Sequence, residues 1–296
     1  MKRKWIRWVS WILLTPIILF VILMVLLYVP PVQNLLRREV TAYASKATGM
    51  QIQVERIDLR FPLNLLVRGV EVIQQPDTLL SLESLNVRVQ AWPLIKGKVE
   101  VDEVTLSRVA VNSADLMEGM KIKGVLGRFF LQSHGVDLSN ELAVINQVEL
   151  SDTHMQLLMN DTTTTPKDTT ASAPINWKVA LHQLKLKNVS FSMQLPADSM
   201  RMTAHIGEAA INNAQADLKN QYYDLKKFLL SGTSASYDTG TAQPTEGFDA
   251  SHIAVRDIRI ALDSLLYKGR DMNAVIREFT MNERSGLRRC RNESHG

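Results

Sequence analysis

The chemically versatile side chains of this chain do not form a recognisable reactive set. No two of the six histidines have the spacing of a metal-binding pair, and one cysteine cannot complete a His/Cys ligand set. The histidines are His134, His154, His182, His205, His252 and His295. We interpret them as solvated or hydrogen-bonded residues and predict no metal site.

Motifs for nucleophilic attack or phosphate binding are also lacking. The sequence has no G-x-S-x-G elbow, and the glycines between Gly119 and Gly127 do not have the spacing of a phosphate loop. The acidic residues are dispersed. Cys290 lies in a basic tail, and a single cysteine cannot form an intrachain disulfide. We therefore expect no enzymatic activity and no cofactor.

Charge argues against nucleic acid as a partner. The 296 residues carry a formal net charge of +4, and much of it comes from the first residues and from Arg284 to Arg291. The rest of the chain is nearly neutral and has no basic stripe interleaved with aromatic residues, which a nucleic-acid surface would need.

An uncharged apolar stretch near the N-terminus predicts one membrane span. Residues 9–29 are long enough to cross a bilayer as a helix, which takes about 20 residues. Residues 1–8 are basic and no acidic residue precedes Glu39, so this tail should be cytoplasmic and the rest of the chain translocated. No small-x-small cleavage site follows, which favours an uncleaved anchor over a signal peptide. The expected interface anchors are Lys2, Arg3, Lys4, Trp5, Arg7, Trp8 and Tyr28.

The residues after the span predict an amphipathic helix over 31–48. Apolar residues recur there at steps of three and four, and Gly49 suits the left-handed position that ends many helices. The helix is expected either to pack on the domain that follows or to lie flat on lipid.

From residue 50 onward a different rhythm predicts β-strands. Apolar residues come in pairs two apart, and two polar residues separate one pair from the next. On a strand, each pair falls on one face, whereas on a helix the same positions would scatter around the circumference. The residues that carry this rhythm are Leu65, Val67, Val70, Val72, Val104, Leu106, Val109, Val111, Val148, Leu150, Leu184, Leu186, Val189, Phe191, Ile253, Val255, Ile258 and Ile260.

The extra polar residue between pairs predicts a β-bulge. Without a bulge, the second pair would turn to the other face. The residue before the second pair is Gly69, Asp152, Asn188 or Asp257 in four main copies, and these types tolerate the positive φ that some bulges need. Arg108, in a fifth copy, does not fit this preference.

The domain over 50–283 should therefore be mainly β. We expect turns at 75–77, 95–97, 133–135, 196–198, 212–213 and 268–270, loops near 160–174 and 231–247, with strand as the alternative for part of the second loop, and an irregular tail over 284–296. A long, twisted sheet of many similar strands follows, with its apolar side chains on one face. Periodicity does not distinguish an open trough, which acyl chains would fill, from a sandwich closed by a second sheet.

Three segments resemble the N-terminal part of the TamB/AsmA-like proteins, especially the TamB-type proteins of the Bacteroidetes. The segments are Pro30 to Glu39, Thr48 to Leu59 and Leu66 to Val72. The resemblance implies a taco-like periplasmic β-groove behind the membrane helix and the amphipathic helix. It also implies a role in phospholipid transport between membranes and in outer-membrane biogenesis, with an outer-membrane barrel assembly protein as partner. The strand residues given above would line the groove, and no catalytic residue carries over.

The resemblance also sets the expected compartment and the alternatives. With one cysteine, the chain suits the periplasmic side of a Gram-negative inner membrane as a single-pass protein. Members of that family are much longer, so we interpret the chain as a truncated product, with roughly fifteen strands that extend only about 70 Å. The alternative function is an interaction scaffold whose exposed sheet edge recruits an assembly partner. A membrane-tethered enzyme ranks third.

Overall fold

The computed structural model describes residues 29–60, 63–90, 93, 100–113, 119–137, 140–159, 176–240, 243, 245 and 247–283. No helix within these residues is long and apolar enough to cross a membrane. The predicted span, apart from Val29, lies outside them, as do the basic tail over 1–8, the tail over 284–296 and the turn at 95–97.

One helix precedes the sheet. Helix α2 (Pro30–Thr48) begins with proline in its first turn, where the fixed φ and the missing N–H cost nothing. It ends at Gly49, whose φ of 70° gives the left-handed cap that the sequence predicted. The helix packs against the first strand, which agrees with the expectation that it would pack on the domain that follows.

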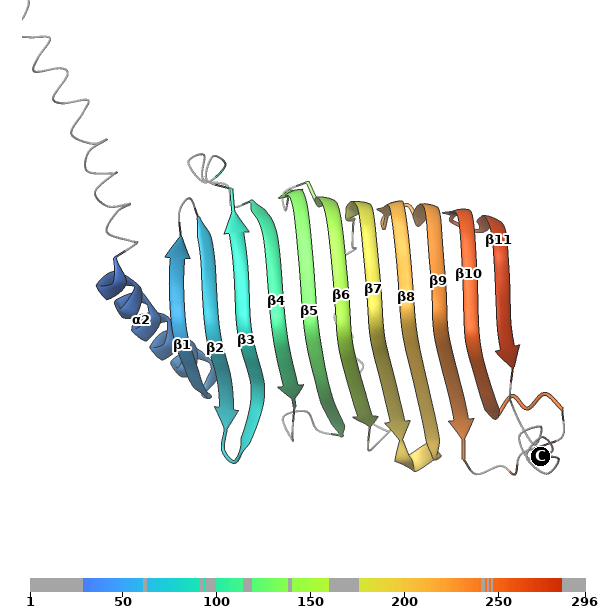
Figure 1. The fold of residues 1–296 in the computed structure, drawn as a ribbon, viewed down its shortest axis with the longest axis horizontal. Helices are drawn as coiled ribbons and strands as arrows, with labels where there is room; N and C mark the ends of the chain where they lie inside the picture. The colour runs from blue at the N-terminus through green and yellow to red at the C-terminus, as the bar shows by residue number, and fades with distance from the viewer. Residues whose placement is uncertain are drawn as a thin grey trace, which may run out of the picture.

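All strands within the described residues belong to one open, twisted sheet of eleven strands in sequence order (Figure 1). The strands are β1 (Gln51–Arg60), β2 (Asn64–Gln74), β3 (Asp77–Val89), β4 (Val101–Asn112), β5 (Met120–Asp137), β6 (Leu142–Met159), β7 (Lys178–Leu195), β8 (Met200–Asp217), β9 (Tyr222–Thr239), β10 (His252–Lys268) and β11 (Asp271–Glu283). At about 4.8 Å per strand, the sheet extends roughly 50 Å along its stacking direction. That is shorter than the 70 Å expected from fifteen strands.

One pair of neighbours differs from the rest. Every adjacent pair is antiparallel except β6 and β7, which run parallel. A parallel pair needs a crossover connection of a dozen or more residues. The chain between Met159 and Lys178 is long enough to return to the level at which β6 begins, so that β7 can start beside it. This connection contains the predicted polar loop.

Three predicted connections were wrong, at least in part. β5 runs through residues 133–135, β8 runs through 212–213, and β9 continues to Thr239, so the predicted loop over 231–247 is strand in its first half. Gly135 and Asn213 have φ values of 148° and 59°, so these residues adjust a strand rather than end it. The turns at 75–76, 196–198 and 269–270 are confirmed.

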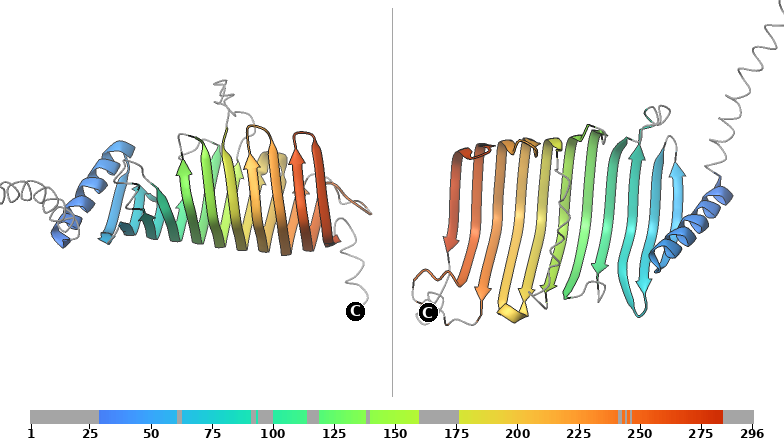
Figure 2. Two further views of the ribbon diagram at one scale, coloured as in Figure 1. Left: turned by 90° about the horizontal axis from the view of Figure 1, so that it is seen from above. Right: turned by 180° about the vertical axis from the view of Figure 1, so that it is seen from behind.

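The described residues form a single layer. Their element contacts join each strand to its neighbours in the sheet and α2 to β1, and no second sheet or helix packs on either face. Seen from above and from behind, the strands follow one another in a single curled row with α2 at one end (Figure 2). The sandwich alternative therefore finds no support in this part of the chain.

Candidate functional site

The sheet registers align the predicted apolar residues into rows that cross the strands. One row contributes one apolar residue from every strand: Ile57, Val67, Leu85, Leu106, Phe129, Leu150, Leu186, Ala209, Leu230, Ile260 and Phe279. Directly paired residues share a face of the sheet, so these side chains form one continuous strip.

A second row lies two residues from the first along β1 to β10, and three residues from it in β11, where the register shifts. It also has an apolar residue in every strand: Leu59, Leu65, Val87, Val104, Leu131, Val148, Leu184, Ile211, Phe228, Leu262 and Ile276. Since side chains two apart point to the same face, the two rows form one surface.

Three further rows hold the remaining predicted residues. One joins Val70, Leu82, Val109, Leu126, Thr153, Val189 and Ile206. The next joins Val72, Leu80, Val111, Gly124, Met155, Phe191, Ala204, Ala235 and Val255. Ile253 belongs to a row with Met202 and Tyr237, and Ile258 pairs with Thr233. We call the five rows together the apolar face.

A line of kinks crosses the sheet between these rows. Gly69, Arg108, Asp152, Asn188 and Asp257 have φ values between 46° and 59°. The positive φ was expected for four of them, and Arg108 adopts it as well.

The kinks differ from the predicted bulges in one respect. Along β4 to β8 the neighbouring strands each carry the extra residue at the same level, so the pairing resumes without a register shift. The kink residues and the residues opposite them form a line from Glu55 and Gly69 in β1 and β2 to Asn188 and Gly207 in β7 and β8. A bend in one strand therefore continues in the next, and the whole sheet bends along a line.

Two glycines in this line lie where a side chain would collide with the neighbouring strand. A Cβ on Gly127 would lie 2.9 Å from the backbone oxygen of Asp152, and one on Gly207 would lie 2.8 Å from that of Gly232. Both distances are shorter than a Cβ tolerates, so these strands approach too closely for any side chain.

Exposure shows which side of the bend is the inside. The kink residues point away from the apolar face into solvent, where Asn188 donates to Asp152 at 2.8 Å and Arg108 pairs with Glu83. On the apolar face beside the kinks, Thr153 is only 5% exposed and Leu82 only 8%. A bend crowds side chains on its inner side and spreads them on its outer side, so the apolar face is the inside.

The apolar face is nevertheless open. Among the described residues, the fully buried apolar side chains are Ile57, Leu79, Leu82, Ala143, Ala209 and Ala261. Most of the five rows are only half-buried, and Val111 and Met155 are 37% and 44% exposed. A sandwich of this size would cover such a face with a second sheet.

The histidines take part in local hydrogen bonds or lie along strands. His154 bonds Gln156 within β6, and His205 bonds Ser190 between β8 and β7. His134 and His182 lie in β5 and β7, and His295 lies outside the described residues. No group of three or more His, Cys, Asp or Glu side chains is placed to hold a metal within the part of the chain that the structure describes.

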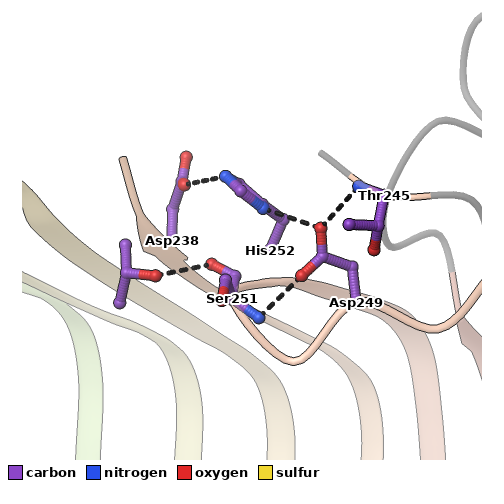
Figure 3. A network of polar contacts seen from close by, with 6 residues as sticks. Asp238, Thr245, Asp249, Ser251 and His252 are labelled. Atoms are coloured by element: carbon purple, nitrogen blue, oxygen red, sulfur yellow. Dashed lines mark hydrogen bonds and ion pairs between the residues drawn. The ribbon is translucent and has the colours of Figure 1, made fainter. Parts of the chain in front are cut away.

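His252 belongs to a polar network that contains Asp249, the group with the largest pKa shift among the described residues (Figure 3). Its ring lies between Asp249, at 2.9 Å, and Asp238, at 3.3 Å. The backbone N–H groups of Thr245 and Ser251 donate to Asp249, and these bonds with that of His252 lower the pKa of Asp249 to about 2. Hydrogen bonds to the ionised form favour it. Both ring nitrogens of His252 face carboxylate oxygens, and we interpret the network as holding the connection between β9 and β10 in place.

Sequence reasoning missed the contacts between α2 and the edge of the sheet. Gln33 Nε2 donates to the Leu59 oxygen at 3.0 Å, and Arg37 Nη1 donates to the Glu55 oxygen at 2.7 Å. The Ile52 N–H donates to Ser45 Oγ at 3.1 Å. These helix residues are spaced at multiples of four, so a polar stripe within the amphipathic pattern was the signal that could have shown this contact.

Comparison with known proteins gives no family for this chain: no family model matches it, and no curated protein resembles it at a significant level.

Proposed function

We propose that the chain is an inner-membrane-anchored periplasmic protein whose apolar face binds and conducts the acyl chains of phospholipids. The observation that carries this proposal is the pair of apolar rows that crosses all eleven strands, on the inside of a bent sheet whose faces no other described element covers. A taco-like groove of this kind is also what the resemblance to TamB/AsmA-like proteins implies.

The free energy of burying acyl chains favours transfer of lipid over its storage. Each buried methylene contributes roughly 0.8 kcal/mol, so a tail of about 15 carbons gains about 12 kcal/mol on leaving water. A bilayer offers the tail a similar gain. Exchange between a bilayer and the apolar face is therefore nearly neutral, and a conduit needs such a balance in order to release its lipid.

The groove also has the right chemistry for mobile occupants. Its rows consist mainly of aliphatic residues, with few aromatic rings and no charged side chain, so a sliding chain meets no charged partner. Polar and charged residues, including the ion pair of Lys185 with Glu149, occupy alternate positions that face outward. The headgroup would remain in water at the open side.

The test compares two double variants of the full chain purified in detergent. Leu106→Asp with Leu150→Asp places a carboxylate on each side of Phe129 in the first apolar row, whereas Ser107→Asp with Ser151→Asp places them on the outer face of the same strands. Native mass spectrometry should show co-purified phospholipid in the wild type and in the outer-face variant, and little in the apolar-face variant. Circular dichroism of each variant checks folding.

Two results would overturn the proposal. One is wild-type protein that is free of lipid after purification and after exposure to phospholipid vesicles. The other is equal lipid content in the two folded variants.

The second candidate function is an interaction scaffold, and the state of β11 favours it. Every residue of β11 except Glu283 is exposed, including Met272, Val275, Ile276 and Phe279. An exposed edge strand can pair with a strand from a partner. An outer-membrane barrel assembly protein that is captured by the wild type but not by a Val275→Pro variant would support this function.

A further inference from the structure

The surface of α2 that faces away from the sheet is the strongest unassigned feature of the molecule. Leu35, Val40 and Tyr43 are 58%, 46% and 77% exposed, and Ala47 is also exposed. Val40, Tyr43 and Ala47 are spaced by three and four residues, so they form one stripe along the helix.

The surface of α2 that faces the sheet is polar, which differs from the usual arrangement. Gln33, Arg37 and Ser45 hold backbone groups of β1, and the hydroxyl oxygen of Thr41 is fully buried on the same side. At about 100° per residue, the centre of this polar surface lies roughly 110° around the helix from the stripe. A surface helix of a soluble domain would turn its apolar side to the protein.

Two observations indicate what covers the stripe. The helix begins at Pro30, directly after the uncharged residues 9–29 that predict a membrane span, so its first turn must lie near a bilayer surface if that span inserts. Arg38 and Lys46 are exposed against one exposed acidic residue, Glu39, so the exposed surface of the helix carries a net positive charge, which anionic headgroups attract.

We propose that α2 lies in the membrane interface, with Val40, Tyr43 and Ala47 against lipid and its polar side holding β1. This inference rests on the membrane anchorage in the proposed function and deepens it. The first strand of the apolar face is then fixed beside the leaflet from which acyl chains would enter. The helix is both the edge cover of the sheet and its contact with the lipid source.

The test uses the full chain in nanodiscs of phosphatidylethanolamine and phosphatidylglycerol. In a Cys290→Ser background, single cysteines replace Tyr43, Val40 or, as a control on the distant strand β11, Thr280. Each is labelled with an environment-sensitive fluorophore. We expect blue-shifted emission at positions 40 and 43 and at least twofold quenching by lipids brominated in the acyl chain, with neither effect at position 280.

The outcomes separate this inference from the functions on which it rests. Failure of the chain to enter nanodiscs would contradict the anchor, and unchanged lipid co-purification in a Val40→Asp, Tyr43→Asp variant would show that the groove works independently of the helix contact. Water-like emission at positions 40 and 43 in nanodisc-bound protein would overturn the inference. A blue shift without quenching by brominated lipid would also overturn it, because a protein partner or a second copy would then cover the stripe.

Discussion

The two edges of the sheet differ in whether another element of the described residues covers them. At the β1 edge, α2 lies along the strand and bonds its backbone through Gln33, Arg37 and Ser45. At the β11 edge, no described element covers the strand, and its side chains are exposed. Exposed edges invite pairing with other chains, and a helix over the edge is one way to prevent it. Among the described residues, α2 therefore occupies the edge of the sheet at β1, whereas the backbone edge of β11 is left uncovered.

The largest expected effect comes from removing the cover at β1. A Gln33→Ala, Arg37→Ala, Ser45→Ala variant leaves three backbone groups without protein partners. Each such bond contributes roughly 0.5–1.5 kcal/mol, and that of Arg37 somewhat more, so unfolding in urea should require about 3 kcal/mol less.

The matched control removes three side chains at the other edge. An Asn273→Ala, Glu278→Ala, Thr280→Ala variant changes exposed residues of β11 and should shift the unfolding free energy by at most about 0.5 kcal/mol per site. Equal losses in the two triple variants would show that the edges do not differ in the way described.

A smaller loss is expected at the line of kinks between the two edges. Gly207→Ala adds a Cβ that would lie 2.8 Å from the Gly232 oxygen, which is backbone and yields only if β8 and β9 separate. Overpacking of this kind costs about 1–3 kcal/mol. Gln215→Ala, an exposed change in the same strand, serves as the control in the same urea series. Tolerance of both changes would mean that the strands are not held this closely.

Association provides a sharper comparison of the edges. The triple alanine variant of α2 presents two bare edges, so sedimentation velocity should show association at lower protein concentration than for the wild type. Adding Ile276→Lys and Phe279→Lys places charge on β11 and should reverse part of this effect, because edge charges oppose strand pairing. Unchanged association in the α2 variant would contradict a protective role of the helix.

The smallest effect concerns pH and the connection between β9 and β10, close to the bare edge. The folded-state pKa of Asp249 is lowered to about 2 from 3.8, so its contribution to stability is complete above about pH 4. The contribution is lost as the pH falls through about 2. Unfolding free energies measured between pH 5 and 2 should decline less steeply for Asp249→Asn than for the wild type, and parallel curves would contradict this assignment.

Much of the sheet was predictable because its rhythm is local. Leu106 and Val109 already indicate a strand with an extra residue between two pairs, and Asn188 and Asp257 indicate where the positive φ falls. The pattern could not show that neighbouring strands kink at the same level, since that depends on pairing between distant residues. Asn212 and Asn213 illustrate the resulting error, because a turn was predicted where β8 continues. Residues that favour a turn also favour a kink within a strand, and only the strand registers distinguish a turn from a kink.

The sequence indicated which apolar residues share a face of the sheet, but not the shape of that face. The pairs that include Val104 and Leu184 indicate a face, and the open or closed state of that face depends on what packs against it. The edge contacts of α2 were missed because the helix was read for its apolar stripe, whereas Gln33 and Arg37 lie outside that stripe and bond the sheet. Polar residues at helical spacing, next to a predicted edge strand, can therefore indicate a packed surface just as apolar residues do.

The most direct test of the account is photo-crosslinking from both faces of the sheet in intact membranes. A benzophenone amino acid placed at Leu106, Leu150 or Leu230 should crosslink to phospholipid. The same amino acid at Ser107, Ser151 or Ser231, one residue further along each strand, should not. Phospholipid crosslinks that are equal on the two faces, or crosslinks from Leu106, Leu150 and Leu230 to protein alone, would contradict an open apolar face that holds lipid.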